Sequence, residues 1–201
     1  GCSAFIYDYM DLDCIEAPNG RACAVATGVR RARPDRVVFA YQGDGDLASI
    51  GLAEAVHAAN RGERVSVFFI NNTLYGMTGG QMAPTTLLGQ KTATSPRGRV
   101  LAGEGGPLHM TEIMAQLAGV GYAARCALDS VAHIRAAGRA VRAAFEVQLR
   151  DLGFGFVELL CGCPTNWRMD PVAANRHICE AMIPVFPLGV FKDVRDSQGA
   201  A

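Results

Sequence analysis

The sequence carries no excess of charge of either sign. Lys plus Arg and Asp plus Glu number 19 each in 201 residues, so the formal net charge is zero at pH 7. A protein that neutralises nucleic-acid phosphates or docks on an anionic membrane needs surplus cations. No apolar run approaches the roughly 20 residues of a spanning helix, and no basic region followed by an apolar stretch opens the chain. We therefore expect a soluble, unexported protein with no nucleic-acid partner and no membrane partner.

A disulfide framework is also lacking. The seven cysteines are odd in number and scattered, and a chain of this length buries a core without bridges. This usage fits a reducing, cytoplasmic setting. An initiator Met is absent too, because the chain begins Gly1-Cys2-Ser3 in what looks like a structured segment. We expect a single domain over residues 1–201, a fragment that lacks its N-terminal segment. The cysteines are Cys2, Cys14, Cys23, Cys126, Cys161, Cys163 and Cys179.

What is present points to a packed α/β protein. Half of the residues are apolar and 19% are charged, which excludes disordered, collagen-like and coiled-coil chains. Apolar β-rich runs alternate with helical patterns. Such alternation predicts a mostly parallel sheet with helices on both faces, whose ligands bind outside the carboxyl ends of the strands. The predicted strands are residues 37–41, 65–70, 122–128 and 154–160, and the predicted helices are residues 47–60 and 130–150.

One stretch breaks this alternation. From residue 71 to about residue 110 no convincing element occurs, and the segment is rich in Gly, Thr and Pro. Loops of that length are usually functional or disordered. Residues 71–81 are neither charged nor of low complexity, so we interpret them as an ordered binding loop.

The run Gly43-Asp44-Gly45-Asp46 follows the first predicted strand and opens the next helix. Glycines and helix amides at a strand end suit a phosphate group. Carboxylates at the same place would repel that group unless a cation lies between them, so the run indicates a divalent ion. Mg²⁺ takes six oxygen ligands and commonly combines one or two carboxylates with substrate phosphates. Asp44 can supply only one of those ligands.

A second ligand stands at the end of the next predicted strand. Asn71 and Asn72 follow Ile70, with Asn72 28 positions after Asp44, and a parallel sheet brings the two strand ends together. Taken alone, Gly-Asp-Gly and Asn-Asn are each more often a turn than a metal site. Their joint occurrence before a long Gly/Thr loop favours a cofactor site. A nucleotide site is disfavoured, because no GxGxxG opens the first strand-helix turn and no GxxxxGK[ST] occurs.

The pairing of Gly-Asp-Gly with Asn-Asn, each at the end of its own strand, resembles the thiamine diphosphate motif, in which Mg²⁺ bridges protein and diphosphate. The resemblance implies a thiamine diphosphate-binding fold of the pyrophosphate type. It also implies that Asp44, the Asn72 side chain and the main-chain carbonyl of Leu74 bind Mg²⁺. The cofactor-binding residues that it implies are Gly43, Asp44, Gly45, Asp46, Asn72, Leu74, Tyr75 and Gly76.

Over essentially the whole chain the sequence is similar to the beta subunit of 2-oxoacid:ferredoxin oxidoreductases. The resemblance rests on positions 1–3, 43–47, 71–72, 75–81, 84–86 and 163–165. It implies thiamine-dependent oxidative decarboxylation of a 2-oxoacid to acyl-CoA and CO₂, with electrons passed to ferredoxin. It further implies an alpha subunit that carries the pyrimidine-binding domain and supplies the activating glutamate. This chain would then hold half of an active site. Because the fragment lacks its N-terminal segment, we also expect it to bind the cofactor poorly alone.

Most members of that family also hold a [4Fe-4S] cluster, through an N-terminal CxxC pair and two later cysteines. Cys2 and Cys163 match the later two, but the CxxC pair is missing. Two thiolates cannot hold a four-iron cluster, so we expect the cluster in the full-length protein and none in these 201 residues. Cys2 and Cys163 should lie near each other; Cys161 has the same facing, but the resemblance selects Cys163. We expect Cys14, Cys23, Cys126 and Cys179 to be small buried apolar residues.

Residues 75–81 are expected to form the part of the site where the substrate reacts. We take Met77 and Thr78 as the candidate catalytic residues, since Met77 matches a family position beside thiazolium and substrate. Gly79 falls where 2-oxoglutarate-using relatives often have a Lys, which favours a branched-chain 2-oxoacid over 2-oxoglutarate. Asn19 stands where many relatives have His, and its role stays open. Residues 91–99 could clamp coenzyme A or cap a partner.

Two other functions remain as alternatives. The first is a non-redox thiamine diphosphate subunit of the decarboxylase or acetolactate-forming type, which shares the Gly-Asp-Gly and Asn-Asn motifs. A CxxC pair upstream of Cys2 would favour the redox enzyme over it. The second is a structural or regulatory subunit that binds Mg²⁺ and diphosphate without turnover.

Overall fold

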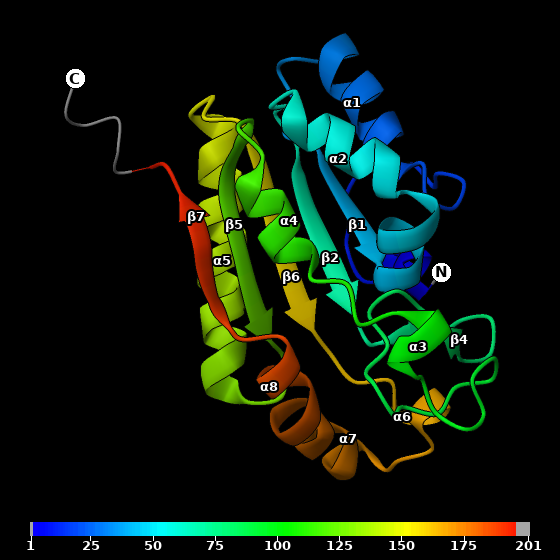
Figure 1. The fold of residues 1–201 in the computed structure, drawn as a ribbon. Helices are drawn as coiled ribbons and strands as arrows, with labels where there is room; N and C mark the ends of the chain where they lie inside the picture. Colours follow the sequence, from blue (N-terminus) through cyan, green and yellow to red (C-terminus); the bar gives the residue numbers. More distant parts are fainter. Residues whose placement is uncertain (1, 196–201) are drawn as a thin grey trace.

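A computed structural model describes residues 2–195 and contains a five-stranded sheet with the strand order β1-β2-β6-β5-β7. The strands are β1 (Phe39–Gly43), β2 (Ser66–Asn71), β5 (Val120–Ala127), β6 (Phe154–Leu160) and β7 (Gly189–Asp193). The first four in spatial order run parallel, and β7 is antiparallel to β5. The carboxyl ends of β1, β2 and β6 point to the same end of the molecule (Figure 1). The predicted mostly parallel sheet is therefore confirmed.

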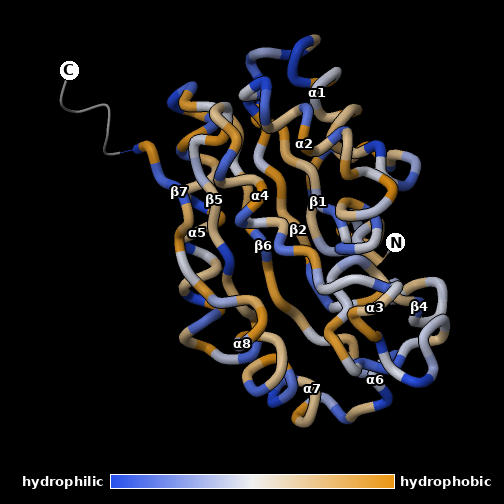
Figure 2. The backbone as a smooth tube through the Cα atoms, in the orientation of Figure 1, coloured by the Kyte–Doolittle hydropathy of each residue, from blue (hydrophilic) through white to orange (hydrophobic). Residues whose placement is uncertain are grey.

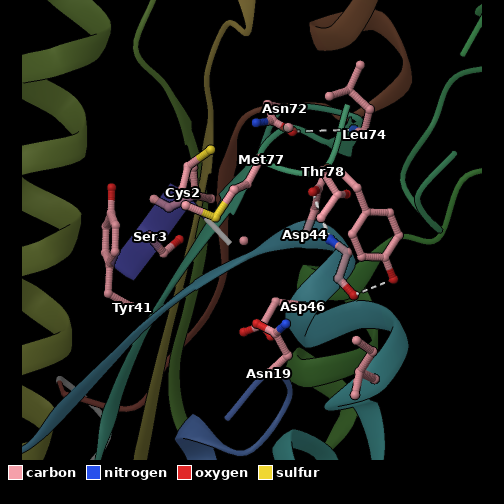
Figure 3. A pocket seen from close by; sticks show the side chains of 16 residues that line it. Cys2, Ser3, Asn19, Tyr41, Asp44, Asp46, Asn72, Leu74, Met77 and Thr78 are labelled. Atoms are coloured by element: carbon pink, nitrogen blue, oxygen red, sulfur yellow. Dashed lines mark hydrogen bonds between the residues drawn. The ribbon is translucent and has the colours of Figure 1, made fainter. Parts of the chain in front are cut away.

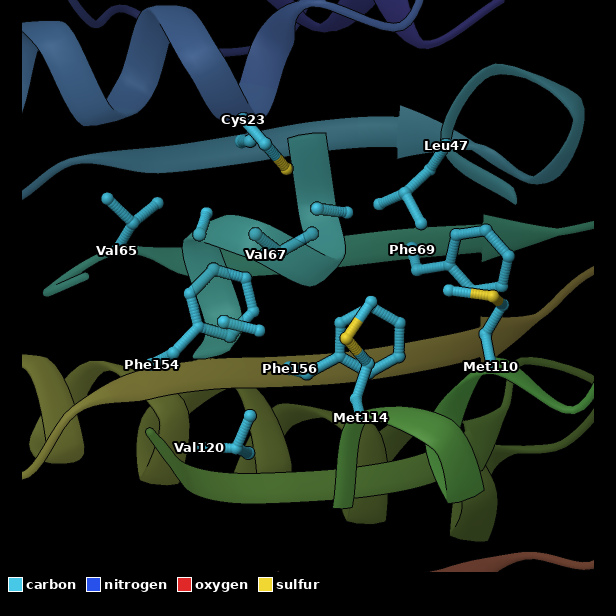
Figure 4. Close-up of a cluster of buried hydrophobic side chains, with 14 of the residues drawn as sticks. Cys23, Leu47, Val65, Val67, Phe69, Met110, Met114, Val120, Phe154 and Phe156 are labelled. Carbon is cyan, nitrogen blue, oxygen red and sulfur yellow. The ribbon is translucent and has the colours of Figure 1, made fainter. Parts of the chain in front are cut away.

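Helices cover both faces of the sheet. On one face lie α1 (Ala22–Ala32), α2 (Leu52–Asn60) and α4 (Met110–Gln116), which pack on Phe69 and Phe156 (Figure 4). On the other face α5 (Val131–Leu149) packs a stripe of alanines on Phe68 and Val157. The central strands β5 and β6 are buried throughout, as parallel strands covered on both faces must be. Figure 2 shows the matching hydrophobic colour along β2 and β6.

The remaining elements are short. The 3₁₀ helix η1 (Cys2–Asp8) lies at the N-terminus of the described chain, and the π-helix η2 (Asp46–Ile50) lies between β1 and α2. The long predicted loop contains a small hairpin, β3 (Leu74–Tyr75) and β4 (Gln81–Met82), and the turn α3 (Leu101–Glu104). The C-terminal part contributes α6 (Pro164–Trp167), α7 (Pro171–His177), the π-helix η3 (Ile178–Met182) and α8 (Ile183–Val185). No helix in this described part of the chain is long and apolar enough to span a bilayer.

The predicted helix over residues 47–60 is divided in two, as η2 and α2. The division falls at Gly51, which packs against the backbone of the loop at Gly20: a Cβ on Gly51 would lie 2.5 Å from the Gly20 carbonyl oxygen. Gly20 itself has φ +77°, a left-handed conformation that favours glycine. This close approach brings the loop that carries Asn19 against the junction of η2 and α2, and a single regular helix was the wrong prediction for this segment.

Candidate functional site

The two predicted motifs meet at adjacent strand ends. Gly43 at the end of β1 pairs in register with Ile70 of β2, so Asp44 and Asn72 follow neighbouring parallel strands. Their side chains line one cavity of about 150 Å³ (Figure 3). Every predicted cofactor-binding residue, together with Met77, Thr78 and Cys2, lines this cavity, and Cys163 is the one predicted site residue that does not. The further lining residues are Ser3, Asn19, Tyr41, Ile50 and Ile70.

Asp44 is buried in this cavity, with 2% of its surface exposed. The Gly45 amide donates to its Oδ1 at 2.8 Å and the Thr85 hydroxyl to its Oδ2 at 2.6 Å. Burial raises the pKa of Asp44 from 3.8 to about 7, although the Thr85 hydroxyl and the amides of Gly45, Thr73 and Asn72 lower it. Within residues 2–195 no Lys or Arg forms an ion pair with Asp44. All of its partners are neutral donors, so a bound cation would offset the burial of its charge.

The turn after β2 holds an unusual backbone conformation. Thr73 is fully buried and has φ 65°, in the left-handed region that a β-branched residue rarely adopts. Three contacts hold it there: its N–H donates to Asn71 Oδ1 at 3.1 Å, Gln90 Nε2 donates to its hydroxyl at 2.8 Å, and the Thr86 hydroxyl donates to its carbonyl oxygen. Strained residues of this kind persist where the surrounding structure determines them strongly, and they cluster at functional sites.

The donor atoms fit a magnesium ion that is shared with a ligand. A carboxylate of Asp44, the amide oxygen of Asn72 and the carbonyl of Leu74 are hard oxygen donors from residues around one cavity. No group of three or more His, Cys, Asp or Glu side chains with metal-binding geometry occurs among the described residues. Mg²⁺ needs no such all-protein group, because it commonly combines few carboxylates with waters and substrate phosphates. This donor set therefore suits an ion that arrives with a diphosphate.

Gly45 lets the backbone come close to the wall of the cavity. A Cβ on Gly45 would overlap the ring of Tyr75, whose hydroxyl donates to the Gly45 carbonyl oxygen at 2.9 Å. A Cβ on Gly76 would lie 3.5 Å from Asn72 Nδ2, an ordinary van der Waals distance. Any larger residue at position 45 would displace the Tyr75 ring and with it the wall of the cavity.

Asp46 also lines the cavity, but both of its carboxylate oxygens accept hydrogen bonds from the protein. Oδ1 accepts from the Gly20 amide at 2.6 Å and Oδ2 from Gln42 Nε2 at 2.7 Å. Asp46 therefore holds the loop that carries Asn19 against the site. Thr78 is engaged as well, since its hydroxyl donates to Gln81 Oε1 at 2.6 Å, while Met77 is half exposed at the cavity.

The structure brings Cys2 and Cys163 together, as the sequence analysis expected. Their sulfurs lie 3.5 and 3.6 Å from the point where a Cβ on Gly76 would stand. Cys161 lies near the same place, and burial, with smaller contributions from Asp44, Cys163 and Cys2, raises its pKa to about 12.

The expectation for the other four cysteines is half right. Cys23 and Cys126 are buried, whereas Cys14 and Cys179 are exposed. Cys14 lies in an N-terminal segment that forms no helix or strand. Cys179 lies in η3, where it is flanked by exposed Glu180. Neither position lies in a packed face, so the prediction that both are buried was wrong.

Sequence reasoning missed the part played by Thr85 and Arg99. Arg99 is 5% exposed and donates hydrogen bonds to six backbone carbonyl oxygens, which gather the loop that carries Thr85. Its role inside the protein makes Arg99 unavailable as a coenzyme A clamp. The Pro84-Thr85-Thr86 motif was the only available signal, and it did not disclose the contact with Asp44. The carbonyl acceptors belong to Ala83, Pro84, Thr86, Glu104, Gly105 and Gly106.

Comparisons with known proteins show the family and the fold of the chain. Residues 5–150 match the family described as thiamine pyrophosphate enzyme, C-terminal TPP binding domain. The chain is 51% identical over 193 residues to the ketoisovalerate oxidoreductase subunit VorA of Methanothermobacter thermautotrophicus, covering 96% of this chain and 40% of that protein. It is 39% identical over 180 residues to the 2-oxoglutarate synthase subunit KorB of Archaeoglobus fulgidus, covering 90% of this chain and 63% of that protein.

Among solved structures, the chain resembles a 2-oxoglutarate:ferredoxin oxidoreductase from Magnetococcus marinus, determined with 2-oxoglutarate, coenzyme A and succinyl-CoA bound. The TM-score is 0.70 at 25% sequence identity, and the match covers 96% of this chain and 69% of that one. The chain spans less than two thirds of the length of the two curated relatives described above. The similarity therefore covers nearly all of this chain but only part of those relatives.

Proposed function

The chain belongs to the thiamine pyrophosphate enzyme family, and on that premise we propose that it forms the cofactor-binding part of a 2-oxoacid:ferredoxin oxidoreductase. The reaction is the oxidative decarboxylation of a 2-oxoacid to acyl-CoA and CO₂, with ferredoxin as electron acceptor. One observation carries the proposal: Asp44, buried among neutral donors, and Asn72 follow two adjacent parallel strands and line one cavity. The relatives named above do not favour the non-redox alternative.

In this proposal Asp44, the Asn72 amide oxygen and the Leu74 carbonyl hold Mg²⁺, which binds the diphosphate of the cofactor. Thiamine diphosphate, when bound, supplies a nucleophilic carbon and an electron sink. The chain's own residues fix it in place: Thr85 orients the Asp44 carboxylate, and Gly45 lets the backbone approach the phosphates. Met77 and Thr78 lie at the cavity where the substrate would enter.

A partner subunit completes the site. No glutamate within residues 2–195 lines the cavity, so the carboxylate that activates the aminopyrimidine must come from elsewhere, which we assign to an alpha subunit with the pyrimidine-binding domain. The N-terminal segment beside Cys2 also exposes many large apolar side chains, which a partner would cover. These are Phe5, Tyr7, Tyr9, Met10, Leu12 and Ile15.

A [4Fe-4S] cluster, held in part by residues of this chain, would supply the one-electron path to ferredoxin. Cys2 and Cys163 provide two of its four thiolates, and their sulfurs face one point beside Gly76, next to the cavity. The other two thiolates would come from outside these 201 residues.

None of the seven cysteines, all within the described residues, forms a disulfide, which supports a cytoplasmic setting.

The substrate side of the cavity favours an apolar 2-oxoacid, with coenzyme A as acyl acceptor. In the described part of the chain no Lys or Arg lines the cavity, so nothing there would pair with a distal carboxylate. Gly79 offers no charge either, and identity is higher to the relative named for ketoisovalerate than to the one named for 2-oxoglutarate. We therefore propose a branched-chain 2-oxoacid as substrate and keep 2-oxoglutarate as the alternative.

The test uses the full-length protein assembled with its partner subunits. We expect coenzyme A-dependent reduction of viologen with 2-oxoisovalerate and much weaker reduction with 2-oxoglutarate. Asp44→Ala should lower the rate at least about 100-fold, because it removes a metal ligand. The control Asp35→Ala, which changes an exposed carboxylate, should keep the wild-type rate. Unchanged activity in Asp44→Ala would refute the site, and CO₂ release without viologen reduction would favour the non-redox enzyme.

A further inference from the structure

A buried polar chain runs from the strand end at the site into the middle of the sheet. Glu158 of β6 is completely buried. Its Oε1 accepts a hydrogen bond from Asn71 Nδ2 at 2.7 Å, and its Oε2 accepts from Arg125 Nε at 2.8 Å and from the Thr111 hydroxyl. Asn71 is also completely buried and directly precedes Asn72. The chain of contacts therefore connects a charged pair inside the sheet with the turn that bears two of the proposed magnesium ligands.

The sheet register explains why these side chains meet. Glu158 pairs with Phe69 of β2 and with Arg125 of β5, so the three residues lie on one face of the sheet. Asn71 lies two residues beyond Phe69 on the same face, next to Glu158. On that face α4 supplies Thr111 and also Glu112, which pairs with the outer nitrogens of Arg125.

Stability alone gives a weak reason for this arrangement. Taking a carboxylate and a guanidinium out of water is expensive, and well-packed apolar residues often stabilise a protein as much as a buried ion pair does. Burial would lower the pKa of Arg125, but its hydrogen bonds and charge contacts with Glu112 and Glu158 raise it, so the guanidinium stays charged. Glu112 already supplies one carboxylate to Arg125. Beyond its pairing with Arg125, Glu158 accepts hydrogen bonds from the Thr111 hydroxyl and from Asn71, and only the contact with Asn71 reaches the turn after β2.

That contact fixes which way the Asn71 amide points. An ionised carboxylate only accepts hydrogen bonds, so Asn71 must present its NH₂ group to Glu158. Its oxygen then faces the other way, where it accepts from the Thr73 N–H at 3.1 Å. If the amide were reversed, its NH₂ group would face the Thr73 N–H and the left-handed turn would lose a supporting bond. The carboxylate therefore selects the orientation that stabilises Thr73 and the residues on either side of it.

We propose that Glu158 is a positioning residue for the turn formed by Asn72, Thr73 and Leu74. Acting through Asn71, it holds the turn so that Asn72 and Leu74 line the same cavity as Asp44. The identity of the ion rests on the proposed function. The dependence of the turn on Glu158 does not, because every contact in it lies within the protein.

The experiment compares Glu158→Gln with Glu112→Gln in the full chain. Each variant removes one carboxylate partner of Arg125. Only Glu158→Gln changes the side chain that contacts Asn71, and its amide can present a donor where the carboxylate could only accept, so the orientation of the Asn71 amide is no longer fixed. We expect Glu158→Gln to weaken the affinity for Mg²⁺, titrated with thiamine diphosphate present, by about tenfold, the lower range for residues that orient metal ligands. Hydrogen exchange at the Thr73 amide should accelerate by a similar factor. Glu112→Gln should change both readouts less than about twofold.

Asn71→Ala supplies the second variant, because it leaves the pair of Glu158 and Arg125 intact. It should reproduce the tenfold loss, and adding Glu158→Gln to it should cause no further loss. Equal effects of the two Gln variants, additive effects in the double variant, or a wild-type response of Asn71→Ala would each overturn the proposal. If the full-length wild type, assembled with its partner subunits, bound neither Mg²⁺ nor thiamine diphosphate, the proposed function would fail, while the exchange rates would still decide the role of Glu158.

Discussion

The buried carboxylate of Asp44 should make the metal-free protein less stable as pH rises. Its folded pKa of about 7 lies above its ordinary value of 3.8, so the folded state binds the proton more tightly than the unfolded state does. The stabilisation from that proton is fully present below pH 3.8 and is lost as pH rises through about 7. Each pKa unit corresponds to about 1.4 kcal/mol, so the complete loss is on the order of 4 kcal/mol.

Asp44→Asn isolates this effect, because it removes the titrating group and keeps the shape of the side chain. We expect the free energy of unfolding of the wild type, minus that of the variant, to fall by about 3 kcal/mol between pH 5 and pH 8. The amide cannot accept from all the donors around Asp44, which costs about 1–3 kcal/mol. At low pH the variant should therefore be the less stable protein. At pH 8 without metal the wild type has lost about 4 kcal/mol, so the variant should be the more stable protein by about 2 kcal/mol.

Urea unfolding in the presence of a chelator measures these differences across the pH range. Asp35→Asn is the control, because Asp35 is an exposed carboxylate whose pKa its hydrogen bond to Arg33 lowers to about 2, and it should give no decline between pH 5 and pH 8. Mg²⁺ with thiamine diphosphate, at about 100 times their dissociation constants, should then stabilise the wild type by about 2.7 kcal/mol and leave Asp44→Asn almost unchanged. A pH-independent difference, or equal stabilisation of both proteins, would refute the reasoning.

Other positions give sharper local tests. Arg99→Met should expose the segment of residues 83–106 to thermolysin at least about tenfold faster, because six carbonyl groups lose their donor, whereas the exposed neighbour Arg97→Met should cleave at the wild-type rate. Gly45→Ala should weaken thiamine diphosphate binding more than about tenfold in a calorimetric titration, since the methyl overlaps an aromatic ring, and Gly28→Ala, with open space around it, should not. Burial raises the pKa of Cys23 to about 12. Its alkylation by iodoacetamide at pH 8, followed by peptide mass spectrometry, should therefore be about 1,000-fold slower than that of an ordinary thiol. A rate like that of the exposed cysteines would contradict this.

The elements that the sequence predicted correctly are those with a strong local signal. β1, β2 and β6 are predominantly apolar runs, and α5 places alanines at helical spacing behind a Ser130 cap. β7 was missed because its residues are mostly exposed and carry no strand pattern, and it forms by pairing with β5. The division between η2 and α2 was missed because the close approach of Gly20 to Gly51 depends on a loop 31 residues earlier in the chain.

The site divides in the same way. Asp44 and Asn72 could be found because each belongs to a short motif at the end of a recognisable strand. Thr85 and Glu158 could not, because their contacts with Asp44 and Asn71 span 41 and 87 residues and depend on the tertiary fold. A hydroxyl in a loop and a lone acid within an apolar strand have many structural uses, and only the packed sheet decides which one applies.

The position of β6 between β2 and β5 has a consequence for biosynthesis. A ribosome that has just completed the Gly-Asp-Gly and Asn-Asn motifs has synthesised both proposed side-chain ligands of the ion, but β6, which lies beside β2, is still untranslated. Parallel pairing over so long a separation closes late, because the entropy of the intervening chain opposes it. The nascent chain should therefore stay without cofactor until β6 has been synthesised, so loading with thiamine diphosphate would mark chains whose central sheet is already assembled.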